Sequence, residues 1–352
     1  MEILEKSRID WVDYAKGICI ILVVMMHSTL GVEKAAGEIS WLHSFIDWAR
    51  PFRMPDFFLI SGLFLASRIN KPWRTYLDSK LLHFAYFYLL WMTIQTFMRS
   101  GAVLQTEGVA SFIKIYLAGF YEPYGTLWFI YLLAIFFVVT KLLHKVPAFL
   151  VFAIAAVLEM APIETGFIII DEFASRYVYF FAGFWLAKHI LTYADSVSAR
   201  SFAVIGAGLV IWGFANHTLV QAGLSNAPGI GLTMGFVGAA AVVSMGVLLS
   251  KTNFATAICY CGANTIVIYL SFSLFMAPAR VLLLRFAPNL DLGLVSLLVT
   301  TAGVLGPVLL FWATRNTKLS FLFMRPAWAT LAKPQARWHN PSHDKFSTLK
   351  IW

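Results

Sequence analysis

The chain has 352 residues, of which 59% are apolar, 16% are aromatic and only 13% are charged, and its formal net charge is +9. With a mean hydropathy of +0.74, too few polar residues remain to cover a soluble globule of this size, so the soluble globular class is excluded. In an integral membrane protein such a charge sets the topology and favours contact with membrane lipid, so we expect no nucleic-acid partner.

Ten apolar runs follow one another along the chain, separated by charged or Gly/Pro-rich breaks. Backbone groups at membrane depth must be satisfied internally, and the runs are longer than the roughly ten residues of a barrel strand, which favours helices. The sequence therefore predicts an all-α, polytopic bundle of about ten transmembrane helices. The expected spans cover about residues 17–31, 54–67, 81–98, 125–143, 147–160, 175–193, 201–219, 229–249, 262–284 and 292–314.

The lysines and arginines predict how these spans are oriented. If the N-terminus is cytoplasmic, most of the 27 basic residues fall in cytoplasmic segments, whereas most of the 18 acidic residues fall on or near the outer side. Basic residues are retained on the cytoplasmic side of membrane proteins. We therefore predict that both termini are cytoplasmic.

The first span places three ionisable residues on one helical face. Lys16 and His27 are eleven residues apart, which is about three turns and roughly 16 Å along a helix, and Asp13 lies on the same side. A polar group at membrane depth is costly unless it is paired or lines a wet cavity, which makes His27 a functional candidate. The alternative is an Asp13–Lys16 ion pair at the membrane edge and a His27 that hydrogen-bonds a neighbouring helix.

The second span opens with the sequence FRMPDFFLISG, from Phe52 to Gly62. Pro55 is tolerated in the first turn of a helix, and Gly62 allows a neighbouring helix or a ligand to approach closely. Arg53 and Ser61 would then be a cation and a hydroxyl beside a gap. The segment is equally consistent with a helix start followed by a packing notch.

Later spans contribute further polar and aromatic candidates at their ends. Trp128 opens the fourth span, Arg176 and Tyr177 open the sixth, and Asn264 and Tyr269 lie in the ninth. Aromatic residues near span ends often mark the membrane interface, and an amide in an apolar span often ties helices together. Each of these residues is therefore either structural or part of a site. The three cysteines have no metal-ligand spacing, so we expect no metal.

Taken together, these elements resemble the acyltransferase-3 family of bacterial membrane acyltransferases. The resemblance rests on Trp11-x-Asp13-x-x-Lys16-Gly17, on the step from Lys16 to His27 and on the Phe52–Gly62 element. Weaker similarities at Leu127–Phe129, Arg176–Gly183 and Asn264–Tyr269 extend it over roughly residues 8–314. Many members carry a histidine directly after the Tyr-Leu pair of the ninth span, whereas Tyr269-Leu270 is followed here by Ser271-Phe272.

The resemblance implies a multi-pass enzyme of the bacterial inner (plasma) membrane. Such an enzyme moves an acyl group, usually acetyl, from cytoplasmic acyl-CoA to a hydroxyl of an extracytoplasmic or lipid-linked glycan. Acyl-CoA is then a donor substrate, and no cofactor is bound permanently. His27 corresponds to the essential histidine of the family and Lys16 to its basic partner.

We assign the candidate residues accordingly. The catalytic candidates are His27, Lys16 and Asp13. Lys16 also belongs to the expected CoA-binding group, whose other members are Arg68, Lys71 and Arg74 on the same expected face. The expected acceptor-binding residues are Arg53, Ser61, Trp128, Arg176, Tyr177, Asn264 and Tyr269.

Imidazole titrates near neutral pH, so His27 suits acyl transfer in two ways. It can accept the proton of the sugar hydroxyl directly or become transiently acylated, and both routes stay open. Ser61, Asn264 and Tyr269 are candidates for stabilising the oxyanion. The alternative function is a proton-coupled transporter or flippase of a glycan or small solute, for which the chain lacks a detectable two-fold internal repeat.

The chain divides into residues 1–314, an acyltransferase-3-like transmembrane domain, and residues 315–352, a basic cytoplasmic tail. Within the tail, Leu319, Phe321, Leu322, Phe323 and Trp328 stand beside Lys318 and Arg325. This pattern predicts a short interfacial helix that serves as an anchor.

Overall fold

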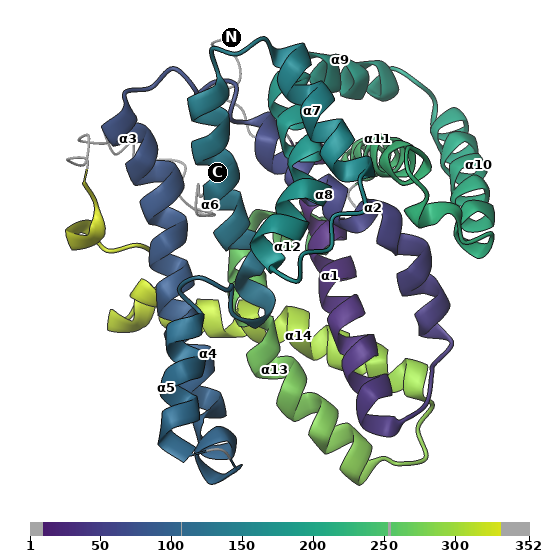
Figure 1. Ribbon diagram of the computed structural model, residues 1–352. Coiled ribbons are helices and arrows are strands. Elements are labelled where there is room, and N and C mark those ends of the chain that lie inside the picture. Colours follow the sequence, from purple (N-terminus) through teal and green to yellow (C-terminus); the bar gives the residue numbers. More distant parts are fainter. Residues whose placement is uncertain (1–9, 107, 253–254, 332–352) are drawn as a thin grey trace.

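The computed structural model describes residues 10–106, 108–252 and 255–331. These residues form fourteen α-helices and short turns of 3₁₀- and π-helix, with no strand among them (Figure 1). The prediction of an all-α membrane bundle is confirmed. Seven helical segments are long and apolar enough to cross a membrane by themselves, while the count of ten and the side on which the termini lie remain predictions.

The helices are, in chain order, α1 (Asp10–Ala36), α2 (Leu42–Leu63), α3 (Trp73–Leu77), α4 (His83–Thr106), α5 (Gly108–Ala118), α6 (Trp128–Leu143), α7 (Ala148–Met160), α8 (Ile168–Trp185), α9 (Ala187–Ser198), α10 (Phe202–Gln221), α11 (Ile230–Ser250), α12 (Thr256–Ala263), α13 (Thr265–Phe286) and α14 (Leu292–Thr314). Helix α1 packs against α2, α11, α12, α13 and α14, so it forms the axis of the bundle. Helix α10 lies at the edge (Figure 1) and is mostly exposed.

Three expected spans differ from the helices found. Helix α2 begins at Leu42 instead of residue 54. Its first turns carry charged residues, but Ile46, Ala49 and Phe52 are buried along one face and hold these turns against the bundle. The expected span 175–193 is divided between α8 and α9 at Leu186. The expected span 262–284 is interrupted at Asn264, where α12 ends and α13 begins.

The described part of the tail folds back onto the bundle. Residues 318–322 and 327–329 form 3₁₀ turns, so the expected interfacial helix is reduced to short turns there. Phe323 is buried between Trp91 and Phe311, with ring centroids 5.5 and 5.9 Å away. The Arg325 guanidinium forms an ion pair with Asp78 at 3.0 Å. Residues 332–352 of the expected tail lie outside the described part.

Glycines bring two pairs of helices into backbone contact. A Cβ at Gly17 would collide with the Ile258 carbonyl, and one at Gly262 with the Asp13 carbonyl, where α1 crosses α12. Gly62 and Gly183 have the same role between α2 and α8. Small residues allow this approach in membrane helices. Of the two interpretations of Gly62, the structure therefore shows the helix contact.

We expect Gly183→Ala to destabilise the protein by about 1–3 kcal/mol, because its Cβ would strike the Leu59 backbone. The measurement is the unfolding free energy in mixed micelles. Gly206→Ala is the matched control, since its Cβ has no neighbour within 4 Å on α10. Equal effects of the two substitutions would contradict the tight crossing.

Candidate active site

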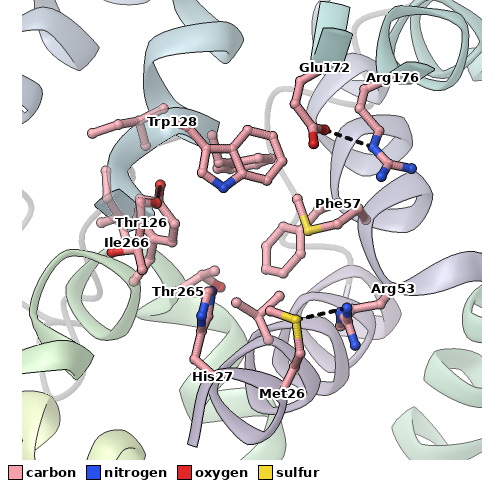
Figure 2. Close-up of a pocket in the computed structure, with 15 residues that line it drawn as sticks. Met26, His27, Arg53, Phe57, Thr126, Trp128, Glu172, Arg176, Thr265 and Ile266 are labelled. Atoms are coloured by element: carbon pink, nitrogen blue, oxygen red, sulfur yellow. Dashed lines mark hydrogen bonds and ion pairs between the residues drawn. The ribbon is translucent and has the colours of Figure 1, made fainter. Parts of the chain in front are cut away.

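One cavity of about 200 Å³ collects several of the candidate residues. Helices α1, α2, α6, α8 and α13 and the turn before α6 contribute to its wall (Figure 2). The wall consists of Val23, Met26, His27, Arg53, Met54, Phe57, Thr126, Trp128, Phe129, Ile130, Glu172, Arg176, Thr265, Ile266 and Tyr269. Five expected site residues, remote in sequence, therefore meet here: His27, Arg53, Trp128, Arg176 and Tyr269.

The His27 imidazole points from α1 into this cavity (Figure 2). It stacks on Phe272 of α13, with ring centroids 5.4 Å apart and an interplanar angle of 28°. No hydrogen bond from another described residue reaches its ring nitrogens. The packing thus fixes the ring while leaving its nitrogens for a ligand, in contrast to the alternative of a histidine that ties two helices together.

Arg53 reaches the same cavity from α2 and is only 6% exposed. Its Nη2 donates to the Met26 sulfur at 3.1 Å and its Nη1 to the Ile46 carbonyl at 3.4 Å. Its Nε is buried and has no hydrogen-bond partner. Among the described residues no carboxylate forms an ion pair with Arg53.

Arg176 and Glu172 stand one turn apart on α8 and both line the cavity (Figure 2). The Arg176 Nε lies 3.1 Å from the Glu172 carboxylate, so this second arginine has its charge compensated. Glu172 was not among the expected site residues. Its i,i+4 spacing from Arg176 was the available signal.

The opposite wall is built around the short 3₁₀ turn Gly125–Leu127, which precedes α6. Gly125 adopts a φ of +53°, which favours glycine. The Tyr269 hydroxyl donates to the Thr126 carbonyl, and the Thr126 hydroxyl oxygen is buried without a partner. Tyr269 therefore holds this turn against α13. Thr126 has no distinguishing sequence signal and was missed.

Two helices begin at this cavity. Helix α13 starts after the break at Asn264, and its first residues Thr265 and Ile266 line the wall, while α6 starts at Trp128. The first N–H groups of a helix lack partners within it, and its N-terminus carries a partial positive charge. At the start of α6 the Phe129 and Ile130 N–H groups bond to the Tyr269 hydroxyl, so the start of α13 is the helix N-terminus left to offer a positive potential to a bound group.

The remaining acceptor candidates lie outside the cavity wall. Ser61 donates to the Phe57 carbonyl at 2.7 Å, and the Tyr177 hydroxyl lies 3.0 Å from the Thr140 hydroxyl. Asn264 donates to the Tyr260 carbonyl at 2.9 Å and so stabilises the break between α12 and α13. Ser271, which follows the Tyr-Leu pair, donates to Val267 of its own helix.

The candidates for the donor lie at the other end of α1 and beyond α2. Lys16 is buried and pairs with Asp13 at 3.2 Å, as one of the interpretations expected. Arg68 and Lys71 stand in the segment after α2, and Arg74 of α3 donates to the Leu331 carbonyl at 3.1 Å. Lys80, in the π-helical turn Asp78–Leu82, is buried with its ammonium 4.4 Å from the centre of the Phe137 ring.

Side chains that could bind a metal ion were compared for their positions throughout the described residues. Across residues 10–106, 108–252 and 255–331, no group of three or more His, Cys, Asp or Glu side chains is placed to hold a metal ion.

Comparison with known proteins agrees with the sequence resemblance. The model of the acyltransferase-3 family, described as an acyltransferase domain, matches residues 9–314. The chain belongs to this family. It is also 24% identical over 230 residues to the inner membrane protein YcfT of Escherichia coli K12. The aligned region covers 58% of this chain and 64% of YcfT, so the chain spans somewhat less than two thirds of the length of YcfT. No solved structure gives a significant match.

Family membership and the apolar helices make this acyltransferase-3 protein a multi-pass membrane protein, and the similarity to YcfT supports the inner membrane as its location.

We expect Tyr269→Phe to lower the unfolding free energy by about 0.5–1.5 kcal/mol, because the buried Thr126 carbonyl loses its donor. Denaturant titration of the protein in mixed micelles measures this change. The control is Tyr121→Phe, which alters a hydroxyl on a side chain that is 63% exposed. An unchanged stability in Tyr269→Phe would show that this bond does not hold the wall.

Proposed function

We propose that the protein transfers an acyl group, in the first instance acetyl, from acyl-CoA to a hydroxyl of an extracytoplasmic or lipid-linked glycan. The observation that carries the proposal is the position of His27. Its imidazole stacks on Phe272 and lines the cavity, and no described residue forms a hydrogen bond with its nitrogens. Arg53 and the N-terminus of α13 line the same cavity. Membership of the acyltransferase-3 family supports acyl transfer as the reaction class.

In the proposed reaction a His27 nitrogen takes the proton of the acceptor hydroxyl as its oxygen attacks the thioester carbonyl. A C–O bond forms, the tetrahedral oxyanion collapses, and the C–S bond breaks. The CoA thiolate then receives the proton from the imidazolium. If His27 is acylated first, its nitrogen forms a C–N bond to the acyl carbon and the C–S bond breaks. The acceptor oxygen then forms the C–O bond as the C–N bond breaks, and the hydroxyl proton ends on the CoA thiolate.

The oxyanion requires donors that no other group already occupies. The Ser61 hydroxyl, the Asn264 amide and the Tyr269 hydroxyl each donate to a backbone carbonyl. The first N–H groups of α13 have no partner within the helix and lie in the wall. We therefore favour these backbone donors over the three side chains for stabilising the oxyanion.

The basic residues after α2 suit the phosphates of the donor. Arg68 and Lys71 are half-buried and Arg74 is exposed, so all three keep contact with water. If the N-terminus is cytoplasmic, they share the cytoplasmic side with Lys16, roughly 16 Å from His27 along α1. The nucleotide would stay at that end, with the thioester directed toward His27.

His27→Gln should abolish transfer, because glutamine fills similar space but cannot accept the proton or carry the acyl group. Membranes are supplied with acetyl-labelled acetyl-CoA, and label in envelope glycans and release of free CoA are followed. His217→Gln is the control, since His217 is exposed on α10. If wild type neither releases CoA nor transfers label from several acyl-CoAs with native envelope extract present, the proposal fails and the transporter takes its place.

Arg68→Gln and Lys71→Gln should each raise the KM for acyl-CoA about two- to fivefold with little change in kcat, because exposed ion pairs each contribute up to about 1 kcal/mol. The double variant should show a larger increase and a weaker salt dependence. Steady-state CoA release measures both constants. Lys188→Gln is the control, since Lys188 is exposed on α9. A loss of kcat with unchanged KM would contradict a donor-binding role.

A further inference from the structure

Arg53 is a buried cation whose charge the described protein leaves uncompensated. It is 6% exposed, its Nε has no partner, and its two Nη atoms reach only a thioether and a carbonyl. Charged groups in a membrane protein are expensive unless they meet an opposite charge or a polar cavity. Arg53 lines the cavity, where such a partner can reach it.

The charges around Arg53 do not supply that partner. The groups that act on it electrostatically are Arg176, Arg50 and Asp47, so cations outnumber acids there. Asp56, one turn further along α2, is buried, and its carboxylate accepts a hydrogen bond from the Cys19 thiol at 4.0 Å. Arg176 differs, because Glu172 compensates its charge at 3.1 Å.

Other parts of the wall add to this positive potential. The first residues of α13, Thr265 and Ile266, line the cavity, and helix N-termini favour bound anions. The rest of the wall is largely apolar, with Met26, Met54, Phe57 and Phe129, so it screens charge poorly. A permanently anionic group is the ligand that fits this combination.

We propose that the acceptor carries a permanent anionic group, a phosphate or a carboxylate, and that Arg53 binds it beside the hydroxyl that is acylated. This inference rests on the proposed function, because it names the chemical class of the acceptor. Arg53 contacts Met26, the residue before His27, at 3.1 Å, and Figure 2 shows both side chains at one end of the cavity. An anion on Arg53 therefore places a neighbouring hydroxyl near the imidazole.

The test measures binding without any donor, so that a role of Arg53 limited to the oxyanion gives no signal. The full chain is placed in nanodiscs of phosphatidylcholine, and diethyl pyrocarbonate modifies His27 at a rate followed by peptide mass spectrometry. Three probes differ only in charge: glucose, glucose 1-phosphate and glucuronate. We expect the two anionic sugars to slow modification of His27 at concentrations at least tenfold below that required for glucose.

Variants assign the effect to Arg53. Arg53→Gln should weaken protection by the anionic probes about tenfold or more, since a charge-assisted hydrogen bond is lost, while Arg53→Lys should retain part of it. Arg285→Gln removes an exposed arginine of α13 that lies outside the cavity wall and should behave as wild type. An unchanged rate of modification without probe shows that a variant keeps the cavity.

Equal protection by glucose and by both anionic sugars overturns the inference, as does protection that survives Arg53→Gln. Inorganic phosphate alone, or phosphatidylglycerol added to the nanodisc, overturns it if either protects His27 as strongly as the sugar anions do. Label transfer that depends on His27 without discrimination among probes sinks this inference and leaves the proposed function. If the anionic sugars protect His27 but no label is transferred from acetyl-CoA, the cavity binds anions without acylating them, and both the proposed function and this inference fail.

Discussion

A polar group at membrane depth must find its partner inside the protein, because the hydrocarbon offers none. Most of the described bundle obeys this constraint: Tyr177 bonds to Thr140, and Asp78 pairs with Arg325. Seven buried side-chain atoms of the described residues depart from it, and two of them are at the cavity. The Arg53 Nε and the Thr126 hydroxyl are buried without partners there, and the His27 imidazole contacts a phenyl ring. Under the proposed function, a polar ligand in this cavity would supply partners to these groups.

Interrupted helices give this cavity its chemistry. The interior of a helix presents only side chains, whereas the start of a helix also presents N–H groups. Asn264 separates α12 from α13. The hydrogen bond from its side-chain amide to the Tyr260 carbonyl stabilises the interruption. The turn at Gly125–Leu127 has the same effect before α6, and Tyr269 connects the two interruptions through the Thr126 carbonyl. Residues that sequence reasoning placed in the site thus position backbone groups as well.

Hydropathy and charge were sufficient to predict the helical membrane class, and the resemblance to the acyltransferase-3 family placed His27 and Arg53 in one site. The break at Asn264 was not predictable, because the apolar run continues through it. Thr126 was missed because its proximity to His27 depends on how the turn before α6 packs, whereas the i,i+4 spacing of Glu172 from Arg176 was a local signal that was not used. Ser61 belongs to the same motif as Arg53 but lies two turns further along α2, where it bonds to its own helix.

Contacts between helix backbones limit how two substrates could meet at His27. Gly17, Gly62 and Gly183 all lie on the Lys16 side of the cavity along their helices, and at these residues α1 is in backbone contact with α12, and α2 with α8. Along α1, the cavity wall begins at Val23 and includes no residue between Val23 and Lys16. A nucleotide is too bulky for such crossings, so under the proposed reaction only the narrow pantetheine arm would pass between the helices. The basic residues after α2 would then retain the nucleotide at one end while Arg53 holds the acceptor at the other, with His27 between the two substrates.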